Sequence, residues 1–278
     1  MTKSKVYYCQ IFIGGGIRMK WKVGCVQMDI AYGDPVKNLE LAEKWFDKAA
    51  SENCTVVVLP ELWSTGYDLE RLPEIGHKEG VDIIHFLQEQ AKKHGFQIVG
   101  GSIAKGTDDG FLNTLYVVDK EGNVVHEYSK LHLIQLMDEH LYLKAGTDET
   151  FFMLDGEASS SFICYDIRFP EWLRKPIIKG AKTMFVVAEW PIQRLDHWRT
   201  LLRARAIENQ CYVIACNRSG EDKNNKFAGH SMIIDPWGEV VSEGGEGEEL
   251  VIGEVNFDHI DSIRSQIPVF EDRRPERY

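Results

Sequence analysis

The chain has 278 residues, 44% of them apolar, and its 43 acidic against 32 basic side chains give a formal net charge of −11. Such a length can bury one large hydrophobic core, and the negative charge repels phosphate backbones and anionic lipid headgroups, so we expect neither nucleic-acid binding nor membrane attachment. No apolar run reaches the roughly 20 residues that a membrane-spanning helix needs, which predicts a soluble protein.

The chain begins with a stretch that has no obvious place in a fold. Its apolar part, residues 6–13, is followed by no small-residue cleavage site before Arg18, so we do not interpret it as a signal peptide. A strand pattern begins only at Trp21. We therefore interpret residues 1–18 as an N-terminal extension and residues 19–278 as a single domain, because no linker divides the remaining chain.

Short apolar runs then alternate with amphipathic stretches, a pattern typical of sheets covered by helices. Strands are predicted, in chain order, at residues 21–27, 56–59, 97–103, 115–119, 161–164, 184–188, 212–216 and 230–234. Helices are predicted at residues 38–52, 82–94 and 195–209, and Pro170 marks the start of another. Turn residues at 119–123 and 235–238 predict hairpins, and therefore antiparallel strands beside them. The sequence predicts an α/β fold with mixed sheets.

Three chemically reactive side chains follow buried strands. Pro60 ends one strand and places Glu61 at its carboxyl end, and Lys130 stands just beyond a second strand-like run. Cys164 ends a third predicted strand. Ligand crevices of α/β sheets typically form at the carboxyl ends of strands, so we expect these three side chains to converge.

The chemistry of the three residues fits covalent catalysis. A thiol becomes nucleophilic when a nearby base takes its proton, and Glu61 is the candidate base for Cys164. Attack on a carbonyl moves negative charge onto oxygen, which Lys130 and the backbone N–H of Tyr165 could receive. Glu61 would then protonate the departing amine, leave a thioester, and activate water to release the acid.

Each of these residues also has a plainer interpretation. A buried cysteine after a strand is more often an inert apolar residue, and a glutamate or lysine beside a strand is mostly a solvated group. The six cysteines include no CxxC pair, and most of them sit in apolar runs, which is typical of reduced thiols in a cytoplasmic protein. What favours catalysis is the local sequence around each of the three residues.

Five segments, in this order, resemble motifs of the nitrilase, or carbon–nitrogen hydrolase, superfamily. They are LPELWSTGY at 59–67, YSKLHL at 128–133, ICYDIRFPE at 163–171, RARAIENQ at 203–210 and GHSMIIDPWG at 229–238. The likeness covers the chain from about Trp21 to its C-terminus. It implies a four-layer α-β-β-α sandwich with mixed sheets, no metal or organic cofactor, and a homodimer or larger homo-oligomer.

The same resemblance implies a Glu-Lys-Cys triad at Glu61, Lys130 and Cys164. Members of the family often carry a second glutamate after the lysine, and the matching stretch 138–146 points to Glu139. The implied part of Glu139 is to orient the amide or Lys130. The alternative is an ordinary surface carboxylate.

Within the family, the closest likeness is to the bacterial omega-amidases, or 2-oxoglutaramate amidases, including those of methionine salvage. The runs LMDEH at 136–140 and AEWP at 188–191 carry this likeness. It implies a small linear amide as substrate, the omega-amide of a 2-oxo acid, and ammonia as a product. Such a substrate has a carboxylate remote from the amide that reacts, so the pocket should offer it a cation.

Arg168, four residues beyond Cys164, is the candidate cation. It could equally form a structural ion pair with Glu171 or Glu208. Tyr67 and Trp190 are candidates for the apolar walls of the substrate site, although packing in the core is the simpler account of Trp190.

Three functions remain open at this stage. The first is hydrolysis of an omega-amide through a cysteine thioester. The second keeps the fold and the thioester but acts on a nitrile or an N-carbamoyl compound. The third is a catalytically silent scaffold that binds a partner through the same fold, which the presence of Glu61, Lys130 and Cys164 argues against.

Overall fold

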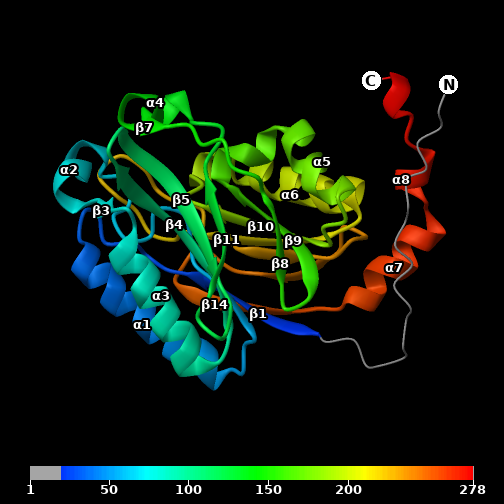
Figure 1. Ribbon diagram of the computed structural model, residues 1–278, viewed down its shortest axis with the longest axis horizontal. Coiled ribbons are helices and arrows are strands. Elements are labelled where there is room, and N and C mark those ends of the chain that lie inside the picture. Colours follow the sequence, from blue (N-terminus) through cyan, green and yellow to red (C-terminus); the bar gives the residue numbers. More distant parts are fainter. Residues whose placement is uncertain (1–19, 278) are drawn as a thin grey trace.

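Two β-sheets packed face to face form the centre of the protein in the computed structural model (Figure 1), which describes residues 20–277. The extension interpreted at residues 1–18 lies outside the described residues. Pairing across the first sheet follows the order β14-β1-β2-β4-β5-β6. These strands are β1 (Trp21–Gln27), β2 (Val56–Val58), β4 (Gln97–Thr107), β5 (Gly110–Val118), β6 (Val124–Ser129) and β14 (Glu249–Val255).

The second sheet follows the order β13-β12-β11-β10-β9-β8. Its strands are β8 (Phe151–Leu154), β9 (Glu157–Ile163), β10 (Thr183–Ala188), β11 (Tyr212–Asn217), β12 (Met232–Ile234) and β13 (Val240–Glu243). Two short strands, β3 (His77–Lys78) and β7 (Leu143–Lys144), pair with β4 and β5 at the side of the first sheet.

Both sheets are mixed, as predicted. In the first sheet β1, β2 and β4 are parallel, whereas β14, β5 and β6 pair antiparallel with their neighbours. In the second, β9, β10 and β11 are parallel and the strands at either end are antiparallel. The two predicted hairpins join β5 to β6 and β12 to β13, so both turn predictions are confirmed.

The period-2 pattern of the strands explains the two cores. In β2, Val56 and Val58 belong to the core between the sheets, while Val57 faces the helices on the outside. Strands β1 and β2 touch the second sheet closely enough for the Cys216 thiol to donate to the carbonyl oxygens of Val26 and Val58, at 3.3 Å each. Strands buried on both faces read as continuous apolar runs, which is why they were predictable.

Helices cover the outer face of each sheet (Figure 1). Over the first sheet lie α1 (Pro35–Ser51) and α3 (Val81–His94), and over the second lie α5 (Pro170–Ile178) and α6 (Leu195–Asn209). Helix α1 begins three residues before its prediction, because Pro35 fits the first turn and the Asp34 side chain accepts a hydrogen bond from the Lys37 N–H at 3.1 Å.

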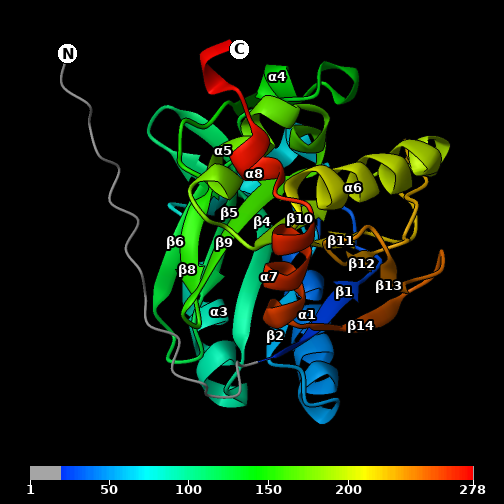
Figure 2. The same cartoon turned by 90° about the vertical axis from the view of Figure 1, so that its right-hand side faces the viewer.

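The remaining helices are shorter. They are α2 (Leu72–Ile75), α4 (Glu139–Tyr142), α7 (Phe257–Gln266) and α8 (Val269–Asp272). Helix α7 crosses the end of the two sheets (Figure 2), where the Phe257 ring meets Trp21 edge-on with 4.8 Å between ring centroids. None of the helices within residues 20–277 has the length and apolar character to span a bilayer.

Two predicted strand boundaries are shifted by residues with a left-handed backbone conformation. Cys164 was expected as the last residue of a strand, but β9 stops at Ile163, and Cys164 begins a 3₁₀ turn with φ of 46°. His230 also has positive φ, 48°, so β12 starts only at Met232. A left-handed backbone conformation breaks strand pairing, and apolar periodicity does not reveal it.

Candidate active site

The three predicted reactive residues all lie beyond the ends of strands and are all buried. Glu61 follows β2 and Lys130 follows β6 in the first sheet, whereas Cys164 follows β9 in the second. Glu61 and Lys130 are 0% exposed and Cys164 is 3% exposed. The predicted convergence is therefore present, and it occurs between the two sheets.

Lys130 joins two carboxylates. Its Nζ lies 2.7 Å from Glu61 Oε1 and 2.7 Å from Glu139 Oε1, with all three side chains fully buried. Burial by itself would lower the pKa of the Lys130 ammonium, but the two carboxylates raise that pKa well above its ordinary value. Lys130 therefore stays charged, and Glu139 is not the surface carboxylate of the alternative interpretation.

Four donors hold the Glu61 carboxylate. Besides Lys130, its Oε1 accepts from the Asn113 Nδ2 at 2.9 Å and from the Tyr67 hydroxyl at 3.1 Å. Its Oε2 accepts from the Glu189 backbone N–H at 2.9 Å. A carboxylate fixed by this many donors has one orientation, and a fixed orientation is what a base needs.

Asn113 was not predicted as a site residue. Its side chain donates to Glu61, and its backbone carbonyl accepts from the Lys130 N–H at 2.8 Å. One residue of β5 thus positions both the carboxylate and the lysine backbone. No local motif marks Asn113. Strand β5 begins five residues before its predicted start, so Asn113 lay outside the predicted strand.

Tyr67 lies in the site but not in the role expected of it. We predicted an apolar wall, whereas the Tyr67 hydroxyl donates to Glu139 Oε1 at 2.7 Å and also reaches Glu61. Burial and the neighbouring carboxylates raise the pKa of the Tyr67 phenol well above its usual value. Tyr67 is therefore a neutral donor that bridges the two glutamates.

The surroundings of Cys164 favour the protonated thiol. Burial, together with the nearby Glu61 carboxylate, raises the pKa of the Cys164 thiol well above that of a free thiol. The positive φ of Cys164 is a strained conformation for a residue with a side chain, costing about 1–3 kcal/mol. Such strain persists only where the surroundings hold it, and here it turns the thiol from β9 toward the carboxylate.

Asp166 ties the cysteine turn to the lysine segment. Its Oδ2 accepts from the Ile163 N–H at 3.0 Å and from the Tyr128 hydroxyl at 2.7 Å. Its Oδ1 lies 2.7 Å from the His132 Nδ1 and accepts from the His132 N–H at 3.2 Å. Tyr128 and His132 stand two residues on either side of Lys130, so one buried carboxylate fixes the two segments relative to each other. Asp166 lies inside a recognised motif, but the sequence alone assigned it no role.

A buried ion pair holds the residue whose backbone N–H donates to Glu61. The Glu189 carboxylate accepts from the Arg218 Nη1 at 2.6 Å, and both side chains are fully buried. Burial raises the pKa of Glu189 to about 8 in spite of that arginine. The Arg218 guanidinium also lies over the Phe227 ring at 4.2 Å and donates to the Ile30 carbonyl at 2.8 Å. The pair holds the backbone whose N–H reaches Glu61, and sequence reasoning missed it.

Arg168 lies in the same turn as Cys164 and beside Trp190, another predicted substrate-binding residue. Its guanidinium lies over the Trp190 ring at 4.9 Å and the Tyr165 ring at 5.9 Å, and its Nη2 is 3.3 Å from the His197 Nδ1. Within residues 20–277 no carboxylate lies within 4.0 Å of Arg168, and Glu208 pairs with Arg205 instead. The structural ion pair considered for Arg168 is therefore not formed.

Trp190 is a packed residue. It is 2% exposed, its ring lies 5.4 Å from that of Trp198, and its Nε1 donates to the Arg194 carbonyl at 2.7 Å. These contacts agree with the simpler account of Trp190 as part of the core. They also fix the ring face on which Arg168 lies.

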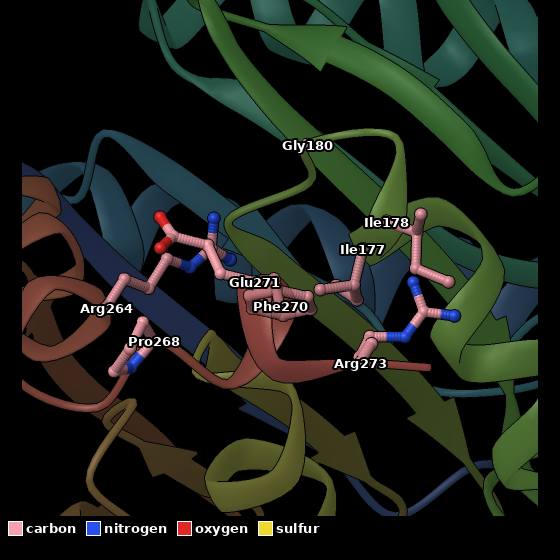
Figure 3. A pocket seen from close by; sticks show the side chains of 8 residues that line it. All are labelled: Ile177, Ile178, Gly180, Arg264, Pro268, Phe270, Glu271 and Arg273. Atoms are coloured by element: carbon pink, nitrogen blue, oxygen red, sulfur yellow. The ribbon is translucent and has the colours of Figure 1, made fainter. Parts of the chain in front are cut away.

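A separate hollow lies between α5 and the C-terminal segment (Figure 3). Its volume is about 360 Å³, and Phe270 faces Ile177 across it with Arg264 beside the ring. It shares no residue with the cluster around Glu61. In the described part of the chain, no group of three His, Cys, Asp or Glu side chains has the geometry to hold a metal ion.

A two-sheet α/β sandwich that buries a thiol beside two carboxylates and an ammonium is typical of an enzyme that works by covalent catalysis. The family model described as carbon-nitrogen hydrolase matches residues 22–265. The chain belongs to the carbon–nitrogen hydrolase family, and the resemblance found in its motifs is confirmed.

Individual relatives agree with this membership. The chain is 53% identical over 260 residues to the 2-oxoglutaramate amidase of Bacillus subtilis. The alignment covers 94% of this chain and 100% of that protein. It is 31% identical over 253 residues to the omega-amidase YafV of Escherichia coli, covering 90% and 96% of the two chains.

A solved structure agrees on the fold. Nit3 of Saccharomyces cerevisiae, a member of branch 10 of the nitrilase superfamily, superposes with a TM-score of 0.85 at 29% identity, covering 93% of this chain and 97% of that one. The predicted α-β-β-α sandwich with mixed sheets is therefore confirmed.

Proposed function

We propose that the protein hydrolyses the omega-amide of a 2-oxo acid, with 2-oxoglutaramate as the leading substrate, and releases ammonia through a thioester on Cys164. The names of the Bacillus and Escherichia relatives support the substrate class. The observation that carries the mechanism is the buried cluster in which Lys130 Nζ lies 2.7 Å from both Glu61 and Glu139, with the Cys164 thiol close enough to Glu61 for that carboxylate to raise its pKa.

The first half of the reaction forms the thioester. As the Cys164 sulfur attacks the amide carbon, its proton passes to Glu61, a C–S bond forms, and the carbonyl π electrons move to oxygen. The Lys130 ammonium and the Tyr165 backbone N–H receive that negative charge. Glu61 then gives the proton to the amide nitrogen, the C–N bond breaks, and ammonia leaves.

The second half releases the acid. Glu61 takes a proton from water, the resulting hydroxide attacks the thioester, and the C–S bond breaks. The sulfur regains the proton, so the sum is one amide and one water converted to one acid and one ammonia.

Glu139 acts on Lys130 rather than on the substrate. Its Oε2 accepts from the Ile134 N–H at 2.7 Å, so the chain segment after Lys130 fixes it. With two carboxylates around one ammonium, Lys130 stays protonated when Glu61 accepts the thiol proton. That is the moment at which the developing oxyanion needs a positive charge.

An ammonia-release screen tests this proposal. The candidate substrates are 2-oxoglutaramate, glutamine, asparagine, a nitrile and an N-carbamoyl amino acid. We expect 2-oxoglutaramate to have the highest kcat/KM. A preference for the nitrile or the N-carbamoyl compound would contradict the proposed substrate class but would leave the thioester mechanism in place. An absence of turnover on all five would favour the silent scaffold.

We further propose a cytoplasmic homodimer or larger homo-oligomer, with residues 19–278 forming one hydrolase domain and residues 1–18 an extension without a catalytic part. The five cysteines among the described residues are all free thiols, which suits a reducing compartment. Exposed Ile178, which lines the hollow of Figure 3, and exposed Ile267 suit an interface between subunits. Light scattering on the protein with and without residues 1–18 measures the oligomeric state and shows whether the extension affects it.

A further inference from the structure

A cavity of about 620 Å³ lies beside the buried cluster. It is walled by the chain after Lys130, by the turn after Cys164 and by the turn before α6. Tyr165, the residue after Cys164, lines it, and so does Ile134, whose N–H holds Glu139. Two lining residues thus connect the cavity to the cluster, Tyr165 as the chain neighbour of Cys164 and Ile134 through its hydrogen bond to Glu139.

One wall of the cavity is cationic. Arg168 and Arg194 both line it, and none of the residues assigned to its lining is acidic. Among residues 20–277 neither guanidinium has a carboxylate within 4.0 Å, in a chain whose net charge is −11. Trp190 holds the two arginines on one side, because its ring lies under Arg168 and its Nε1 donates to the Arg194 carbonyl.

Aliphatic side chains also line the cavity. They are Leu133, Ile134 and Leu136, and Leu136 is 75% exposed. A ligand that fits such a space has a short apolar chain with an anionic group at the end away from the cluster. The omega-amide of a 2-oxo acid has this form, with a carboxylate and a 2-oxo oxygen on adjacent carbons.

We propose that Arg194, together with Arg168, forms a two-guanidinium subsite that binds the carboxylate and the adjacent 2-oxo oxygen of the substrate. This rests on the proposed function and assigns Arg194 as a specificity-determining residue. Guanidinium groups present planar pairs of donors that match carboxylate oxygens, and an ammonium cannot reproduce that geometry. Two positive charges at this end also disfavour the 2-ammonium group of glutamine.

Kinetics of Arg194→Gln on two amides test the subsite. Pentanamide has the five carbons of 2-oxoglutaramate but neither carboxylate nor oxo group. We expect kcat/KM for 2-oxoglutaramate to fall about 10- to 100-fold, mainly through KM, as for the loss of a hydrogen bond to a charged group. The kcat/KM for pentanamide should stay within about twofold. Arg194→Lys should recover only part of the loss.

Arg199→Gln is the matched control. It removes the same charge from the neighbouring helix, but Arg199 pairs with Glu243 at 2.6 Å and lies outside the cavity lining. We expect it to change neither substrate by more than about twofold. Equal losses on both amides in Arg194→Gln, or no loss on either, would overturn the subsite.

Direct binding separates this proposal from the proposed function. Calorimetric titration with 2-oxoglutarate, the acid that hydrolysis would release, measures the subsite without turnover. We expect the Kd to rise at least about tenfold in Arg194→Gln and to stay unchanged in Arg199→Gln. If wild type fails to hydrolyse 2-oxoglutaramate, the proposed function falls, while this shift still supports the subsite. An unchanged Kd in Arg194→Gln overturns the subsite whatever the turnover.

Discussion

The buried cluster and the cavity beside it are built in opposite ways. In the cluster, Glu61, Lys130 and Glu139 are 0% exposed, and the Lys130 ammonium already donates to both carboxylates. In the cavity, Arg168 and Arg194 are half-buried and have no carboxylate partner among residues 20–277. The groups assigned to chemistry are fixed before substrate arrives, whereas the groups assigned to recognition are left for the substrate to pair.

This contrast has a physical reason. Preorganised charges cost no reorganisation when the transition state forms, so the reacting groups gain from being held by the protein. A recognition group that is already paired within the protein would have to break that pair before binding. The two regions should therefore respond differently to mutation: changes in the cluster affect every amide, and changes in the cavity affect only anionic ones.

The largest expected effect comes from Glu61→Gln. The amide retains the size of the side chain but accepts no proton, so both thioester formation and its hydrolysis lose their base. We expect kcat to fall about 100- to 10,000-fold on 2-oxoglutaramate and on pentanamide alike. Ammonia release measures it, with circular dichroism as the check on folding. Normal ammonia production by this variant would contradict the role of Glu61. A loss confined to 2-oxoglutaramate would contradict the claim that changes in the buried cluster affect every amide.

Asp166→Asn tests the buried cluster indirectly, because Asp166 holds the segments that carry Cys164 and Lys130. The variant weakens the link between the Cys164 turn and the segment that carries Lys130, so both groups lose their relative position. We expect kcat to fall about 10- to 100-fold on both amides with little change in KM, because small misplacements of reacting groups are costly.

Asp235→Asn is the matched control for Asp166→Asn. Asp235 is also buried and accepts backbone N–H groups, those of Trp237 and Glu239 at 2.9 Å each, but in a hairpin far along the chain. We expect it to lower thermal stability without lowering kcat. If the two variants lose stability and activity in parallel, Asp166 is merely structural.

The last expected effect is on the reactivity of the Cys164 thiol rather than on turnover, and it depends on pH. Because the folded site raises the pKa of this thiol well above that of free cysteine, the thiolate fraction keeps increasing through neutral and mildly alkaline pH. We expect alkylation of Cys164 by iodoacetamide, followed by peptide mass spectrometry, to rise about tenfold per pH unit from 7 to 9. A plateau below pH 8 would instead mean a thiolate stabilised at rest, as in a Cys–His pair.

The sequence was sufficient where the signal is local. Helix α6 has its predicted bounds, Leu195–Asn209, because its buried residues recur at helical spacing as far as Asn209. Glu61, Lys130 and Cys164 were identified because each one follows a strand-forming run within a motif of its own. Strand β14 was missed, since it is only partly buried and pairs with β1 at the opposite end of the chain.

The supporting residues of the site were not predictable in the same way. Asn113 reaches Glu61 only through the register of β5, and the Arg218 partner of Glu189 comes from the strand end next to it in the second sheet. Tyr67 was expected to form an apolar wall of the substrate site, because the sequence shows the residue type but not where its hydroxyl points. Such contacts depend on long-range packing, which periodicity and local motifs do not encode.

The most direct test is to look for the covalent intermediate. Wild-type protein mixed with 2-oxoglutaramate, quenched in acid and digested should yield an acylated peptide containing Cys164. In Cys164→Ala that adduct should be absent and ammonia release should drop to background, with the fold retained. Continued ammonia release by Cys164→Ala, or acylation of a different residue, would contradict the assignment of Cys164 as the nucleophile.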